Sequence, residues 1–279
     1  MAPRALGRPI QAQSVRVGRR CRQLGRSSAG RLAAPHQVSP VAPVVRSGLS
    51  FRRPTMLTDL FVIFHGIGDP PAHIPAEERP YWIPEQTFRA FIRDANRAAC
   101  AAGVQIVPTF DDGNRSDVDI AAPVLVDSKL PGLFFPCTGR IGRKGYLTEA
   151  DLRTLNGHAF EIGSHGVDHV PWRRLDPDAL YHEIAHSKVV IERILGHDIT
   201  SAALPFGYYD AATLRLLRKS GYKAVYSSAP GISPADSWFR CRWCYRKDKR
   251  FDIQSIARRS RTLGFRLVSE GKHFLKSLL

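Results

Sequence analysis

The fold class of this chain can be inferred from the segment Gly103-Val-Gln-Ile-Val-Pro-Thr-Phe-Asp-Asp-Gly113. Its first glycine ends a helix-like pattern that starts at Glu85, and the β-branched and aromatic residues after it predict a strand. The strand ends in two carboxylates and a second glycine, which lets the chain turn. A helix-like pattern begins soon afterwards, at Asp117. This order of helix, strand, polar turn and helix is typical of alternating α/β folds.

The same alternation continues on both sides of this stretch. Repeated strand-helix-strand units predict a parallel sheet with helices packed outside it, and the number of strands favours a barrel-like closure over an open sheet. Thr148 and Asp176 are placed to cap two of the helices. The expected strands are Leu60–His65, Val104–Phe110, Leu133–Cys137, Phe160–Ser164, Ala202–Phe206 and Lys223–Ser228, with a seventh near Phe239–Arg246, and the expected helices are Glu85–Ala102, Asp117–Ser128, Glu149–Asn156, Pro177–Leu195 and Ala211–Ser220.

Charge divides the chain into three parts. Residues 1–55 hold eleven arginines and no acidic residue among Pro, Gly, Ala and Ser, a composition that cannot bury a core. Residues 240–279 hold twelve basic and three acidic residues, whereas residues 56–239 hold 18 basic and 22 acidic ones. We expect a disordered extension over 1–55, a globular domain over 56–245 and a basic tail over 246–279. A nucleic-acid-binding surface on the domain is not expected, because both basic excesses are terminal.

The arginine-rich extension has three explanations: an organellar presequence, a disordered basic arm, or translation from upstream of the true start. We favour the third, because Met56 is the only methionine besides Met1 and the first expected strand begins close behind it. Neither a secretory apolar segment nor a membrane-spanning run of about 18 apolar residues is present. The five cysteines are irregularly spaced, and Cys241-Arg-Trp-Cys244 lacks the second pair that a structural zinc requires. We therefore expect a cytoplasmic protein in a reducing compartment.

Residues suited to a catalytic site follow four of the expected strands. Singly, an Asp-Asp-Gly turn or a histidine in a loop is an ordinary surface feature. The carboxyl ends of parallel strands meet at one edge of a sheet, however, so we expect these residues to lie together. The candidates are Asp111 and Asp112 after the second strand, His165 and His169 after the fourth, Pro205, Phe206, Gly207 and Tyr208 after the fifth, and His65 after the first.

These residue types suit metal-assisted hydrolysis. Two neutral imidazoles and one carboxylate can hold a divalent cation and still leave positions open for water and a substrate carbonyl. A second carboxylate beside the metal ligand can take a proton from the attacking water. Asp111 and Asp112 are adjacent in the sequence, so the pair can divide these two roles. The sequence therefore predicts a site that cleaves an amide.

The two central motifs resemble those of the polysaccharide deacetylase family, also called the NodB-homology or carbohydrate esterase family four domain. Thr109-Phe-Asp-Asp-Gly113 is similar to its first motif, and Ser164-His-Gly-Val-Asp-His169 is similar to its histidine motif. The resemblance runs from Phe61 to about Arg242. It implies a distorted (β/α) barrel of six to seven parallel strands, a divalent metal such as Zn2+, and an N-acetylated sugar polymer or oligomer as substrate, of the chitooligosaccharide or poly-N-acetylglucosamine type. It further implies Asp111 as base and Asp112, His165 and His169 as metal ligands.

The chain departs from the family pattern in two places. The third motif of the family often has an arginine two residues before its proline, whereas this chain has Ala203-Leu-Pro205, so the arginine that orients the base is absent at that position. The late histidine motif that supplies the catalytic acid is also absent, since His273 lies in the basic tail.

One branch of the family, which includes biofilm poly-N-acetylglucosamine deacetylases, has an early histidine instead. Phe64-His65 and Pro84-Glu-Gln-Thr-Phe88 resemble that branch, and this resemblance implies His65 as the general acid. The stretch Leu204-Pro-Phe-Gly-Tyr-Tyr-Asp210 resembles the third motif of the branch, and its residues Pro205–Tyr208 are expected to contact the substrate. Phe239–Trp243 is weakly similar to its late arginine segment, but we do not count Arg242 among the predicted site residues.

Two other functions remain open. His182-Glu183-Ile-Ala-His186 has the spacing of zinc peptidases on an expected helix, but both histidines fall off the apolar stripe of that helix. A third ligand, His197, would follow the glycine that ends the helix. The second alternative is a catalytically silent glycan-binding module, against which the retention of Asp111 argues. The oligomeric state is not predicted.

Overall fold

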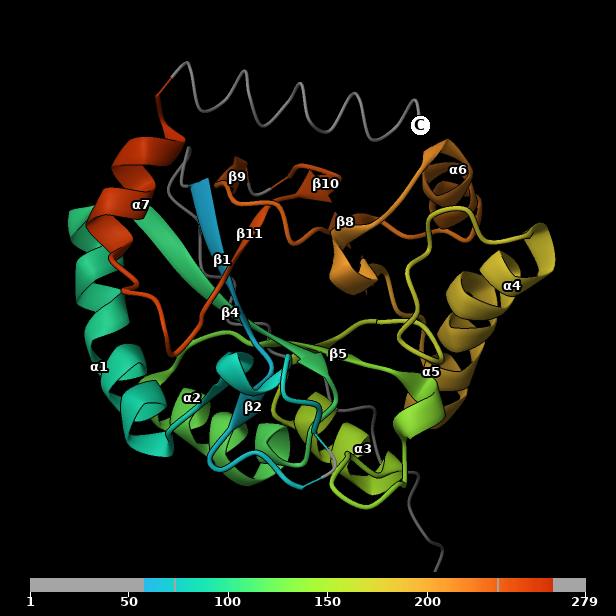
Figure 1. The fold of residues 1–279 in the computed structure, drawn as a ribbon, viewed down its shortest axis with the longest axis horizontal. Coiled ribbons are helices and arrows are strands. Elements are labelled where there is room, and N and C mark those ends of the chain that lie inside the picture. The colour runs from blue at the N-terminus through green and yellow to red at the C-terminus, as the bar shows by residue number, and fades with distance from the viewer. Residues whose placement is uncertain (1–57, 73, 235, 263–279) are drawn as a thin grey trace, which may run out of the picture. The chain divides into compact units, whose positions relative to one another are not determined.

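The computed structural model describes residues 58–72, 74–234 and 236–262, so the extension 1–55 and the end of the basic tail lie outside the described residues. Figure 1 shows the helices arranged around a central group of strands. The elements are β1 (Thr58–Phe64), β2 (Gly66–Ile67), β3 (Trp82–Ile83), α1 (Glu85–Ala101), β4 (Val104–Asp112), α2 (Ala122–Ser128), β5 (Leu133–Pro136), α3 (Glu149–Gly157), β6 (Glu161–Ile162), α4 (Pro177–Tyr181), α5 (Ser187–Leu195), β7 (Ser201–Ala203), α6 (Ala211–Lys219), β8 (Ala224–Tyr226), β9 (Ser233–Pro234), β10 (Phe239–Arg240), β11 (Arg242–Cys244) and α7 (Ile253–Ser260).

Most of the strands pair in parallel, in a six-stranded and a three-stranded set, while β9 pairs antiparallel with β1 and β2 pairs only with β3. β11, β1, β4, β5 and β6 pair in that order, and β10, β8 and β7 form a second parallel set. A single parallel bridge between Ser164 and Ala202 joins β6 to β7. Residues 239–244 pair with β8 through β10 and with β1 through β11. The predicted α/β class with a parallel sheet is confirmed, and the pairings close on themselves, as a distorted barrel requires.

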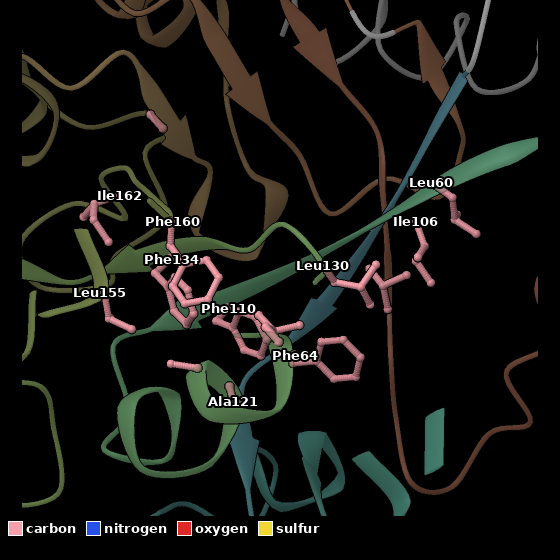
Figure 2. Packing of buried hydrophobic residues seen from close by; sticks show 14 of the residues in the cluster. Leu60, Phe64, Ile106, Phe110, Ala121, Leu130, Phe134, Leu155, Phe160 and Ile162 are labelled. Atoms are coloured by element: carbon pink, nitrogen blue, oxygen red, sulfur yellow. The ribbon is translucent and has the colours of Figure 1, made fainter. Parts of the chain in front are cut away.

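Strand side chains alternate between two apolar clusters, because successive residues of a strand point to opposite faces. Phe64, Phe110 and Phe134 belong to the larger cluster, which includes the buried faces of the helices, and Figure 2 shows them beside Ala121. The smaller cluster contains only strand residues: Phe61, Val107, Leu133, Phe135, Ala203, Ala224 and Tyr226. It fills the space that the strands enclose. The barrel interior is therefore packed, which leaves the ends of the strands for a functional site.

The helix ends follow the predicted caps. The Thr148 hydroxyl accepts a hydrogen bond from the backbone N–H of Asp151, and the Asp151 carboxylate accepts one from the backbone N–H of Thr148. Asp176 accepts hydrogen bonds from two backbone N–H groups at the start of α4. The single helix expected over Pro177–Leu195 is α4 and α5 joined by a π-helical turn, η4 (His182–His186). These caps fix where the helices begin, and so also the positions of the loops that carry the site residues.

Part of the segment assigned to the basic tail is helical. In α7, Ile253, Ile256 and Ala257 are buried and face α1, while Arg258 and Arg259 are exposed. The apolar residues at positions i, i+3 and i+4 are the signal for this helix, and the surrounding arginines mask it in a count of charges. None of the helices within the described residues is long and apolar enough to cross a membrane.

Candidate active site

β4 carries two carboxylates at its carboxyl end. The strand continues to Asp112, two residues beyond the predicted end, and Asp111 and Asp112 pair with Phe135 and Pro136 of β5. Only 3% of Asp111 and 5% of Asp112 is exposed. Asp112 has a φ angle of 78°, a left-handed conformation that is uncommon outside glycine and that redirects the chain immediately after the strand. The two adjacent carboxylates can therefore meet different partners.

Asp112 lies with His165 and His169, as predicted. Asp112 Oδ1 is 3.3 Å from His169 Nε2 and 3.8 Å from His165 Nε2. The ligand atoms of the three side chains lie within 4.8 Å of one another, and in the described part of the chain this is the only group of three or more His, Cys, Asp or Glu residues so arranged. These three residues are consistent with a site for a divalent metal.

The environment of Asp112 suits a bound cation. Asp112 Oδ1 is fully buried and accepts no hydrogen bond, and Arg140 Nη1 approaches it to 3.4 Å without hydrogen-bond geometry. A buried carboxylate oxygen without a donor is costly unless a cation neutralises it. An oxygen and two imidazole nitrogens are the ligands that Zn2+ prefers at catalytic sites. The residues present therefore fit a metal.

Both histidines are held in the form that binds metals. His165 Nδ1 lies 2.9 Å from the carbonyl oxygen of Ala203, a contact that places the proton on Nδ1 and leaves Nε2 free to face the carboxylates. Burial lowers the pKa of His165 to about 4 and also lowers the pKa of His169. Burial acts to raise the pKa of Asp112, but the neighbouring imidazoles and Arg140 outweigh it and bring the value to about 2. Neutral imidazoles and an ionised carboxylate are the ligating forms.

Asp111 is held by Arg242, which the sequence analysis left outside the predicted site. Arg242 is fully buried and donates two hydrogen bonds to the carboxylate, from Nη1 to Oδ1 at 2.7 Å and from Nη2 to Oδ2 at 2.8 Å. It also donates to Thr109 Oγ1 at 3.2 Å and to the carbonyl of Ser227 at 3.1 Å. The arginine missing at position 203 is thus replaced by one from β11. The weak similarity of Phe239–Trp243 to a family segment was the only signal for it.

Arg242 sets the charge of Asp111. Burial acts to raise the pKa of this carboxyl, but the Arg242 guanidinium and the imidazole of His165 outweigh it, so the pKa lies below its usual value. His165 Nε2 is 3.8 Å from Asp111 Oδ2. Asp111 therefore remains a carboxylate beside the metal-binding residues, which is the state that a general base requires.

His65 follows β1 at the same edge of the sheet. Its carbonyl oxygen accepts a hydrogen bond from Asn114 Nδ2 at 3.2 Å, which ties it to the loop after Asp112. Burial acts to lower the pKa of His65, but the Cys244 sulfur and the carboxylates of Asp112 and Asp111 raise it to about 9. The imidazole is therefore protonated at neutral pH.

The predicted substrate-binding turn lies on the His169 side of the site. Pro205 and Gly207 are buried and shape the turn, whereas Phe206 is 52% and Tyr208 47% exposed. The rings of Phe206 and His169 have centroids 4.5 Å apart. The structure thus brings an exposed aromatic surface next to a predicted metal ligand.

The loop that carries the two histidines rests on Glu183, which the sequence analysis noted only as part of the peptidase motif. The Glu183 carboxylate accepts hydrogen bonds from the backbone N–H groups of Val167 at 2.9 Å and Asp168 at 3.1 Å, and from Trp172 Nε1 at 3.2 Å. Gly166 has a φ angle of +84°, and a Cβ atom there would lie 2.3 Å from Glu183 Oε2. Glu183 therefore holds the loop that carries the two histidines.

The zinc-peptidase motif His182-Glu183-Ile-Ala-His186 does not form a metal site in the described structure. Glu183 is buried, whereas His182 and His186 are exposed, and their rings stack with centroids 5.0 Å apart. His197 contacts Asn156 and the carbonyl of Asp198 instead. Among the described residues, His182 and His186 belong to no group of three metal-binding side chains.

Comparison with known proteins agrees with this geometry. The pattern that defines the polysaccharide deacetylase family matches residues 99–225. A Bacillus subtilis (strain 168) protein, YxkH, provisionally named a polysaccharide deacetylase, is 30% identical over 131 residues. The match covers 47% of this chain and 47% of YxkH, so the chain matches about half the length of this curated relative.

Solved structures share the fold. The deacetylase PplD of Streptococcus pyogenes, in complex with acetate, aligns with a TM-score of 0.60 and 18% identity over 74% of this chain and 99% of its own. IcaB from Ammonifex degensii gives a TM-score of 0.61 and 21% identity over 72% and 97%. A de-N-acetylase from Aggregatibacter actinomycetemcomitans gives 0.59 and 15% over 71% and 99%. Residues 99–225 therefore match the polysaccharide deacetylase family, and the described part of the chain shares its fold with these solved structures.

Proposed function

We propose that this domain is a metal-dependent deacetylase that removes the N-acetyl group from an N-acetylated sugar polymer or oligomer, of the chitooligosaccharide or poly-N-acetylglucosamine type. The observation that carries the proposal is the divided carboxylate pair at the end of β4. Asp112 faces two neutral imidazoles, whereas Asp111 is held by a buried guanidinium. A module that only bound sugar would not need a second ionised carboxylate beside a metal site.

Asp112, His165 and His169 would hold the cation, and Zn2+ fits this oxygen and nitrogen donor set best. When bound, a divalent cation acts as a Lewis acid that polarises a substrate carbonyl and acidifies water. Asp112 comes from the end of β4 and the two histidines from the loop after β6, and three protein ligands would leave a bound cation able to accept water and substrate as well.

Asp111 is the general base of the proposed reaction. Arg242 occupies both of its oxygens from one side, fixing the carboxylate plane. As the water oxygen attacks the acetyl carbon, its proton passes to Asp111. The C–N bond then breaks, and the leaving amine takes a proton from His65, the proposed general acid. The products are acetate and a sugar with a free amine.

Phe206 and Tyr208 are the proposed substrate contacts. Aromatic rings bury the apolar faces of pyranose sugars well, and both rings stay partly open to solvent beside His169. Two of the solved relatives support the acetyl substrate: one is described as a deacetylase in complex with acetate, and another as a de-N-acetylase. Pro205 and Gly207 hold the aromatic turn in shape.

The proposal is tested by measuring acetate and free amine released from N-acetylglucosamine oligomers. The wild-type chain is expected to release both in equal amounts, to stop after chelation, and to recover when Zn2+ is returned. Asp111→Asn is expected to abolish most of the release, while His182→Ala, a change in an exposed histidine away from the site, leaves it unchanged. Binding of the oligomers without acetate release by the wild-type protein would contradict the proposal and favour the silent binding module.

A further inference from the structure

Cys244 lies beside His65, although the two residues are 179 positions apart. The pairing of β11 with β1 sets Cys244 opposite Ile63, so the two strands end side by side. Cys244 Sγ is 4.0 Å from His65 Nδ1 and 3.6 Å from the carbonyl oxygen of Tyr245. Sulfur hydrogen bonds are longer than those of oxygen because the sulfur atom is larger. The thiol is thus in contact with the residue proposed to protonate the leaving group.

The two contacts of the sulfur fix the direction of the hydrogen bonds. The Tyr245 carbonyl can only accept, so the thiol proton points to it. The sulfur lone pairs then face His65 Nδ1, which must carry a proton to make the contact. The proton that can be exchanged with a substrate is consequently the one on Nε2. In a histidine, a hydrogen bond at one ring nitrogen determines which nitrogen is available to exchange a proton.

The remaining surroundings of His65 do not contact Nδ1 in this way. The Tyr81 ring lies with its centroid 5.0 Å from the imidazole, and the Arg246 guanidinium lies 4.9 Å from the centre of that ring. The carboxylates of Asp111 and Asp112 act on His65 only through their charge, and burial raises the pKa of nearby Asp117 well above its usual value, which favours its neutral form. Cys244 is therefore the one described side chain with a polar contact to the His65 ring.

We propose that Cys244 is a positioning residue of this deacetylase, whose thiol holds His65 Nδ1 so that Nε2 is the nitrogen that protonates the leaving amine. The inference rests on the proposed function, in which His65 is the general acid. It assigns a role to the second cysteine of Cys241-Arg-Trp-Cys244, a motif in which the sequence showed no function. Cys244 touches neither substrate nor metal in this role.

The contact between Cys244 and His65 can be tested independently of enzyme activity, by nuclear magnetic resonance titration of His65 in the chelator-treated full chain. Wild type is compared with Cys244→Ala, Cys244→Ser and Cys241→Ser, and the His65 signal is identified by its loss in His65→Gln. Cys241 is the matched control, because it lies on the same segment and packs on Gly231. The sulfur raises the pKa of His65, so Cys244→Ala is expected to lower the titration midpoint. Serine is expected to restore most of the shift, and Cys241→Ser to leave the midpoint unchanged.

The role is tested by the pH dependence of deacetylation in the same variants. Cys244→Ala is expected to lower kcat about tenfold or more, with little change in KM, and to move the alkaline limb to lower pH. A defect in folding alone would lower activity without moving the limb. An unchanged His65 midpoint in Cys244→Ala would overturn the proposal. A shifted midpoint with unchanged kcat would also overturn the positioning role, and if His65→Ala were then fully active, the acid assignment in the proposed function would fail with it.

Discussion

Replacement of Arg242 by methionine is the most informative change to the site. The guanidinium is fully buried and makes four hydrogen bonds, two of them to Asp111, which is itself only 3% exposed. Methionine fills a similar volume without charge, so Asp111 would be left as a buried carboxylate without its cation. Removing one partner of a buried ion pair costs about 3–5 kcal/mol of the free energy of unfolding, because the remaining charge is neither solvated nor paired.

The loss of stability in Arg242→Met is expected to depend on pH, and its direction follows from the pKa of Asp111. In the wild type the pKa of folded Asp111 lies below its unfolded value, so ionisation contributes stability above the unfolded pKa, and this is lost as pH falls through the folded pKa. Without Arg242, the effect of burial dominates, and the pKa of Asp111 in the folded protein rises above its value in the unfolded chain. The ionised form then costs stability at neutral pH, and the cost disappears below the raised pKa. The difference in the free energy of unfolding between the wild type and Arg242→Met is therefore largest at neutral pH and becomes smaller in acid.

The assay is urea unfolding of the chelator-treated wild type, Arg242→Met, Asp111→Asn and the double variant at several pH values. The double variant is expected to recover most of the loss, because it removes both charges. Arg242→Met alone is expected to lower the rate of deacetylation about 10²-fold, because Asp111, the proposed base, is no longer held as a carboxylate. If Arg242→Met lowers the free energy of unfolding by less than about 0.5 kcal/mol, or by an amount that does not vary with pH, then Arg242 does not stabilise the Asp111 carboxylate.

Three further changes test the remaining parts of the site. Asp111→Asn is expected to keep its metal while losing acetate release about 10²-fold or more, whereas His165→Ala loses both; equal metal loss in the two variants would contradict the division of roles. Glu183→Gln weakens the support of the histidine loop, so its metal affinity is expected to fall about 10–100-fold by calorimetry, and wild-type affinity would show that the support is dispensable. Phe206→Ala is expected to raise KM for N-acetylglucosamine oligomers without changing metal content, and an unchanged KM would remove Phe206 from the substrate surface.

Much of the fold could be predicted because its signals are local. The predicted strand Leu133–Cys137 corresponds to β5 (Leu133–Pro136) almost residue for residue, and the cap at Thr148 marks the start of α3. The grouping of the three candidate metal ligands could also be predicted, since Asp112 lies at the end of one strand and His165 and His169 lie in the loop after another. Parallel strands bring their carboxyl ends together whatever the separation in sequence.

The parts that could not be predicted depend on tertiary contacts. Arg242 reaches Asp111 across 131 positions only because β11 pairs with β1 and closes the barrel. Glu183 supports the histidine loop through a contact between a helix and a turn, which its place in a zinc-peptidase motif obscured. The φ angles of 78° at Asp112 and 56° at His169 are likewise set by the surrounding structure, and strained backbone of this kind is concentrated at functional sites.

Asp112, His165 and His169 are proposed to hold one divalent cation together, and the metal content of the protein decides whether they do. The wild-type chain is dialysed against Zn2+ and its bound metal is measured together with that of Asp112→Asn, His169→Gln and the double variant His182→Ala/His186→Ala. We expect about one tightly bound ion per chain in the wild type and in the double variant, and loss of that ion in Asp112→Asn and His169→Gln. A wild type that binds no metal, or an ion that survives in Asp112→Asn and leaves with His182 and His186, would contradict it.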